Sequence, residues 1–174
     1  MKFAVASFVA FVLLFAGRAI SAQESPQTLA LGEINRDIWE PFVRGVNTFD
    51  HELYSRVRAR DSVFVDGKRL FGYEEYVEDA FRVMTPLQAA GARLDMQVRF
   101  EERTTDGAHA FERGILRTVI TDKGGAQRTG YARFQVISRR QSDGWRIVTD
   151  YRWRTGSDTD ARAFDAARSS DSFE

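Results

Sequence analysis

The spacing of hydrophobic residues changes once along this chain, and this change restricts the possible folds more than any other feature. Over most of the segment before residue 92, apolar residues recur at intervals of three and four, the period of an amphipathic helix. Beyond it they alternate with polar residues, which is the period of a half-buried β-strand, beginning with Leu94, Met96, Val98 and Phe100. Helices followed by an antiparallel sheet indicate an α+β domain.

The alternating region divides into four predicted strands. The first starts near residue 92, and the others span roughly 108–121, 127–140 and 145–154. The short segments DG, DKGG and DG separate them, and such residues favour the tight turns of β-hairpins. The spacing therefore predicts a four-stranded antiparallel meander.

Helices and a short hairpin are predicted before the meander. The amphipathic pattern from Leu31 to Phe49 is interrupted by Pro41, so we expect a kink or break near Glu40. Asp50 can cap a second helix through its carboxylate. A strand at 62–65 then turns back at an Asp-Gly pair, and a third helix follows.

The first 22 residues have the three parts of a secretory signal peptide. Lys2 precedes an apolar run from Phe3 to Phe15, and the small residues Ala19, Ser21 and Ala22 follow it. The run is shorter than a bilayer-spanning helix. We therefore predict cleavage after Ala22, a periplasmic or secreted location, and no membrane contact after cleavage. A retained N-terminal anchor is the alternative.

The rest of the chain is predicted to hold one globular domain. Residues 23–28 are polar and indicate a linker, and residues 29–155 contain the helical and alternating patterns. Residues 156–174 are rich in Ser, Asp, Ala and Arg, so we expect a flexible C-terminal tail. Because 43% of the residues are hydrophobic, the domain can build a substantial core.

Charge and composition exclude several classes of function. Without residues 1–22 the chain has 23 basic and 25 acidic residues, a balance that argues against binding to nucleic acid. There is no cysteine, so stability cannot depend on disulfides. Two isolated histidines and scattered carboxylates match no metal-binding pattern, and we expect neither metal nor cofactor.

Three segments form a series that is similar to a known superfamily. They are NTFDHELYSRVRARDSVFVDG at 47–67, AFERG at 110–114 and DGWRIVTDYRW at 143–153. In this order they resemble the nuclear transport factor 2-like superfamily, specifically its SnoaL-like bacterial branch of small proteins. The similarity covers about residues 31–154.

The resemblance implies a cone, in which N-terminal helices pack within a curved antiparallel sheet and a pocket opens at the wide end. It does not imply a reaction, because the superfamily contains both enzymes and non-catalytic binding or assembly modules. This sequence departs from many relatives at Arg58, where they carry an aromatic residue. It also has no histidine late in the chain, where catalytic relatives often place one.

Glu112 is the first candidate for a catalytic residue. By strand alternation it shares a face with the small residues Ala110 and Gly114, and this face should line the pocket. Burial would raise the pKa of this carboxyl and make it useful as a general base. Alternatively, an arginine such as Arg128 or Arg146 pairs with Glu112, since buried charges are usually paired.

Asp150 is the second catalytic candidate. Strand alternation turns its side chain away from the pocket unless a β-bulge reverses the faces late in the strand, so a structural ion pair is favoured.

Several aromatic residues are candidates for ligand contacts, although most should belong to the core. They are Trp39, Tyr54, Phe100, Phe134 and Trp153.

Arginines and apolar residues alternate on the opposite face of the meander, where Phe111, Tyr131 and Ile137 are found. Such a mixed surface indicates an interface, and relatives often dimerise through this sheet, so we expect a homodimer.

Three functions are compatible with these patterns. The favoured one is binding of a small apolar or amphipathic ligand without turnover. The others are an isomerase, dehydratase or cyclase that uses Glu112, and a structural dimerisation module whose pocket is filled.

Overall fold

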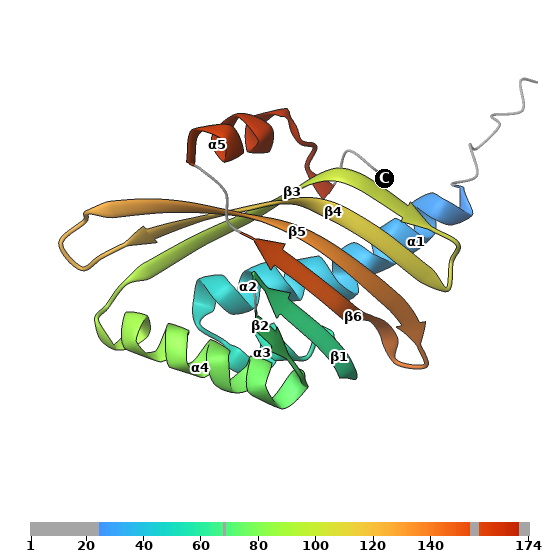
Figure 1. The fold of residues 1–174 in the computed structure, drawn as a ribbon, viewed down its shortest axis with the longest axis horizontal. Helices are drawn as coiled ribbons and strands as arrows, with labels where there is room; N and C mark the ends of the chain where they lie inside the picture. The colour runs from blue at the N-terminus through green and yellow to red at the C-terminus, as the bar shows by residue number, and fades with distance from the viewer. Residues whose placement is uncertain (1–24, 68, 154–156, 171–174) are drawn as a thin grey trace, which may run out of the picture.

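The computed structural model describes residues 25–67, 69–153 and 157–170. In this part of the chain, helices precede a six-stranded sheet that curves around them (Figure 1). The predicted α+β architecture is therefore confirmed. Residues 1–22, the predicted signal peptide, lie outside the described residues. None of the described helices is long and apolar enough to span a membrane.

The N-terminal helical segment is longer than predicted and contains an irregular turn. Helix α1 spans Pro26–Ile34 and α2 spans Glu40–Thr48, and a π-helical turn, η1, joins them over Asn35–Trp39. The irregularity thus lies directly before Pro41, near the predicted break. The predicted linker at 23–28 is wrong in its second half, because Ser25 caps α1 and accepts a hydrogen bond from the Thr28 amide.

A tight corner joins α2 to α3, which spans His51–Ser55. Phe49 ends α2 in the left-handed conformation, with φ of 56°. Asp50 caps α3 as predicted, because its carboxylate accepts a hydrogen bond of 2.8 Å from the Leu53 amide. The chain then enters the first strand.

A hairpin and one long helix complete the part before the meander. Strand β1 spans Arg58–Asp66, β2 spans Arg69–Phe71 and α4 spans Tyr73–Ala89. Pro86 lies inside α4, near its C-terminal end.

The meander contains the four predicted strands. They are β3 at Arg93–Thr105, β4 at His109–Thr121, β5 at Gln127–Gln141 and β6 at Gly144–Trp153. The strand order is β2-β1-β6-β5-β4-β3, with β1 parallel to β6 and the other neighbours antiparallel. Side chains on the inner face pack with α1, η1 and α2 in one hydrophobic core that includes Ile34, Phe42, Leu116, Phe134 and Ile147.

Two β-bulges change which side chains face inward. In β3 the register shifts between Phe100 and Glu102, so that Arg103 pairs with Glu112 on the inner face. In β6 it shifts at Val148, so that Asp150 rather than Thr149 lies inside. The bulge that the prediction for Asp150 left open is therefore present.

Residues 157–170 of the predicted flexible tail pack on the sheet, which corrects the prediction for this part of it. Helix α5 spans Ser157–Ala166 and lies on the opposite face of the sheet from α2 and α4 (Figure 1). Phe164 is fully buried there against Arg99, Arg117 and Tyr131. Polar contacts also hold the segment, because Arg133 pairs with Asp160 and Arg168 forms a β-bridge with Phe100.

Candidate functional site

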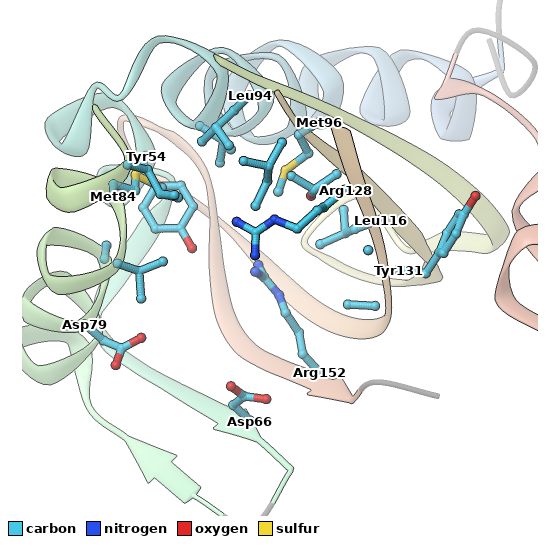
Figure 2. Close-up of a pocket in the computed structure, with 18 of the residues that line it drawn as sticks. Tyr54, Asp66, Asp79, Met84, Leu94, Met96, Leu116, Arg128, Tyr131 and Arg152 are labelled. Atoms are coloured by element: carbon cyan, nitrogen blue, oxygen red, sulfur yellow. The ribbon is translucent and has the colours of Figure 1, made fainter. Parts of the chain in front are cut away.

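A cavity of about 410 Å³ lies between α4 and the inner face of the sheet. Figure 2 shows side chains from α4 on one side and from the meander on the other, converging on this space. The α4 residues on the cavity wall follow helical spacing and are Tyr76, Ala80, Met84 and Leu87. The sheet contributes the apolar side chains of Leu94, Met96, Leu116 and Ile120, together with aromatic, threonine and charged residues.

Small residues on β5 explain why this space is open. Gly130 and Ala132 lie on the cavity wall, at inward positions where larger side chains would fill it. A Cβ atom at Gly130 would meet no other atom within 4 Å. Further along the same strand, Phe134 is fully buried and closes the core. The size of the inward residues thus decides where the sheet packs on the helices and where it leaves room.

Four charged side chains also line the cavity: Asp66, Asp79, Arg128 and Arg152. Asp66 and Arg128 are exposed, whereas Asp79 and Arg152 are half-buried. Asp79 forms an ion pair with Arg82 on the same helix. The cavity is therefore apolar along its walls and charged where it approaches solvent.

Arg152 belongs to a buried group of two arginines and one carboxylate. Its Nε and Nη2 donate to Asp150 at 3.1 and 2.7 Å, and Nη2 of Arg58 donates to the same carboxylate. The side chains of Arg58 and Asp150 are each only 1% exposed. Burial is the largest single effect and acts to lower the pKa of Arg152, but the charge and hydrogen bonds of Asp150, together with Tyr54 and Tyr76, outweigh it and raise the pKa. Arg152 therefore stays charged, and one carboxylate is shared between two arginines.

Aromatic rings surround the buried Arg58 guanidinium. Its central carbon lies 3.8 Å from the ring centroid of Tyr76 and 5.5 Å from that of Tyr54, which are favourable distances for cation–π contacts. Burial raises the pKa of Tyr76 well above its ordinary value, so this phenol stays protonated. Aromatic side chains thus enclose the buried guanidinium of Arg58.

Glu112 is fully buried but does not line the cavity. Its Oε1 accepts a 2.7 Å hydrogen bond from Nε of Arg103, and both oxygens accept from Nε1 of Trp39, at 3.0 and 3.1 Å. Burial raises the pKa of Glu112, although Arg103 and Trp39 act in the opposite direction. The alternative prediction of an ion pair is therefore confirmed, but the partner is neither Arg128 nor Arg146.

The two carboxylates proposed as catalytic residues are not brought together in an open site. They face inward on strands β4 and β6, on either side of Val136 of β5. Each is enclosed by its own arginine partners, and neither is a cavity-lining residue. The structure thus gives Glu112 and Asp150 the geometry of structural ion pairs.

The aromatic candidates for ligand contacts divide into two groups. Tyr54 and Trp153 line the cavity. Trp39, Phe100 and Phe134 were wrongly included, because they pack against one another in the core with ring centroids 5.0 to 5.9 Å apart. No group of three histidines or acidic residues in the described part of the chain is placed to hold a metal ion.

Sequence reasoning missed Arg152 and the α4 residues of the cavity. The helical spacing of Tyr76, Ala80 and Met84 was a usable signal, but it does not say whether a stripe packs on core or on a cavity. Arg128 shares its strand face with Gly130 and Ala132, so alternation alone could have placed it here.

Comparison with known proteins identifies the fold. No family profile and no curated protein matches the sequence. A conserved protein from Planctomyces limnophilus matches 73% of this chain and 94% of its own, with 24% identity and a TM-score of 0.57. A nuclear transport factor 2-like protein with a cystatin-like fold from Novosphingobium aromaticivorans matches 78% of this chain and 88% of its own, with 17% identity and a TM-score of 0.60.

A third structure, a ketosteroid isomerase-like protein from Erwinia carotovora atroseptica, matches 73% of this chain and 97% of its own. It has 18% identity to this chain and a TM-score of 0.57. These similarities confirm the predicted nuclear transport factor 2-like fold.

Proposed function

We propose that this domain binds a small amphipathic molecule in its cavity and releases it chemically unchanged. The observation that carries the proposal is the composition of the cavity, with aliphatic and methionine walls and charged side chains that are exposed or half-buried. A volume of about 410 Å³ with few polar groups is typical of a site for a small organic ligand.

The two other hypotheses have less support in the geometry. A general base must come within hydrogen-bond reach of the substrate, whereas Glu112 is enclosed by Arg103 and Trp39 outside the cavity. A purely structural module would fill its pocket with its own side chains. The open space beside Gly130 argues against that arrangement.

Blocking the cavity tests the proposal. Nile red, a neutral dye whose emission changes in apolar surroundings, should bind to the protein with saturable fluorescence. Gly130→Phe places a ring where a Cβ atom meets nothing within 4 Å, so it should fold normally and weaken dye binding about tenfold or more.

Gly32→Phe is the matched control, because this glycine also has no neighbour within 4 Å of a Cβ atom but lies on α1, away from the cavity. It should bind Nile red as the unmodified protein does. If Gly130→Phe bound Nile red as tightly as the unmodified protein does, the proposed site would be contradicted.

Mass spectrometry of a ligand that has been bound and released should show an unchanged mass. A product of different mass would contradict binding without turnover.

A further inference from the structure

Two arginines of the cavity point at each other, and among the described residues no acidic side chain pairs with Arg128. Figure 2 shows the Arg128 side chain descending from β5 and the Arg152 side chain rising from β6, with their guanidinium ends facing one another. Like charges that face one another repel, so an anion placed between them would be favoured. The positions of the two arginines therefore indicate the charge of the group that a ligand places between them.

Arg128 is free to bind a ligand. It is exposed, and the described residues offer it no hydrogen bond or ion pair. An arginine directed to bulk solvent would be unremarkable, but this one extends over an apolar cavity floor formed by Leu94, Met96 and Leu116 (Figure 2). Its five donors can thus reach a polar group whose apolar part lies below.

Arg152 is held in place rather than free. Asp150 binds its Nε and Nη2, which leaves Nη1 without a hydrogen bond among the described residues. Its guanidinium also lies 5.0 Å from the ring centroid of Phe42 and 5.3 Å from that of Phe64. A donor oriented in this way loses little conformational entropy when a ligand arrives.

The surrounding charges favour an anion at this point. Asp150 is shared by Arg58 and Arg152, so this buried group keeps one net positive charge beside the cavity. Asp66 and Asp79 also line the cavity and would oppose an anion. However, Asp79 is paired with Arg82, and Figure 2 shows the Arg152 side chain pointing away from Asp66 and toward Arg128.

From this geometry, and resting on the proposed function, we infer that the ligand is an amphiphile with an anionic oxygen headgroup. Arg128 and Nη1 of Arg152 bind the oxygens, and the apolar part lies against Leu116, Met84 and Met96. A carboxylate, a sulfate and a phosphate share this chemistry, since guanidinium groups bind all three through charge-assisted hydrogen bonds. A neutral alcohol with an alkyl chain of the same length cannot form these charge-assisted hydrogen bonds to the two arginines.

Calorimetric titration with decanoate, decyl sulfate, decyl phosphate and 1-decanol tests the inference. At least one of the anions should bind about ten- to hundredfold more tightly than 1-decanol, and the order among them identifies the headgroup. Arg128→Gln should remove most of that difference while changing the affinity for 1-decanol less than about threefold. Because Arg128 is exposed, this variant should fold normally.

Arg139→Gln is the matched control, since Arg139 lies on the same strand but pairs with Asp61 and does not line the cavity. Its preference for the anion should equal that of the unmodified protein. The inference would be overturned if the anions and 1-decanol bound equally well, or if Arg128→Gln and Arg139→Gln lost the preference for the anion to the same extent. In either case, binding of Nile red would leave the proposed function intact. Absence of binding by all four compounds and by Nile red would overturn both.

Discussion

The two buried carboxylates of the sheet interior differ in how their charge is compensated. Glu112 meets Arg103 alone, with the neutral indole of Trp39 as a further donor, whereas Asp150 meets both Arg58 and Arg152. Removing one partner of a buried pair leaves an uncompensated charge, which costs far more than the pair itself contributes. Glu112 is therefore the carboxylate most dependent on a single cation.

Arg103→Met should destabilise the fold at neutral pH by about 3–5 kcal/mol, because Glu112 would stay buried without its counter-ion. Urea unfolding measures the change. In the double variant Arg103→Met/Glu112→Gln both charges are absent and the amide oxygen can still accept from Trp39, so its stability should return close to that of the unmodified protein. An equally unstable double variant would show that packing, rather than charge, explains the loss.

The pH dependence of Arg103→Met gives a second readout of the same prediction. Burial already raises the pKa of Glu112 above its ordinary value of 4.5, and loss of Arg103 removes the largest opposing effect. A carboxyl whose pKa rises on folding favours the folded state below its unfolded pKa, and this contribution is lost as pH rises through the folded pKa. The destabilisation by Arg103→Met should therefore shrink on acidification toward pH 4.5. A loss that is constant with pH would contradict this assignment.

The corner between α2 and α3 depends on a close approach of two backbones. A Cβ atom at Gly45 would lie 2.6 Å from the amide nitrogen of Tyr54 and 2.9 Å from its Cα. Both are main-chain atoms, so the two helices would have to move apart. This corner positions Tyr54, one of the cavity residues.

Gly45→Ala should lower the free energy of unfolding by about 1–3 kcal/mol, although alanine has the higher helix propensity. Thermal or urea unfolding measures it. Gly32→Ala in α1 is the matched control, since no atom lies within 4 Å of the added methyl group. The control should be stabilised by about 0.5–1 kcal/mol. A stabilised Gly45→Ala would show that the corner relaxes freely.

The outer face of the sheet is only partly covered. Helix α5 packs on β4 and β5, but three exposed hydrophobic residues lie beyond it on the adjacent strands β1, β5 and β6: Val63, Ile137 and Tyr151. Val63 and Ile137 both pair with Thr149, so they lie in one row across the sheet. We expect the predicted homodimer to use this uncovered area, because α5 already packs on part of β4 and β5.

Ile137→Asp should therefore convert a dimer to a monomer, because an aspartate at the centre of the uncovered area would be desolvated on association. Sedimentation velocity at several protein concentrations measures the assembly. Leu70→Asp is the control, since Leu70 is the more exposed residue and lies on β2, outside the row. A monomeric unmodified protein would contradict the homodimer prediction.

Most of the architecture could be predicted from local patterns. The change from helical to alternating spacing predicted the helices and the meander, and the turn residues predicted where each strand ends. These signals are local, because a strand or helix displays its period within a few residues. Alternation along β5 also puts Gly130, Ala132 and Phe134 on one face, and the burial of Phe134 and the cavity beside the other two show that this face points inward.

The sequence alone thus determined the fold class, the order of elements and the inward face of most strands, since each depends on the period of nearby residues. Only the tertiary structure decided which charged groups meet. Arg103 in β3 and both Asp150 and Arg152 in β6 face inward because a bulge precedes each group and inverts the alternation. Where one extra residue is accommodated depends on how neighbouring strands pair and curve, and that is a property of the whole sheet.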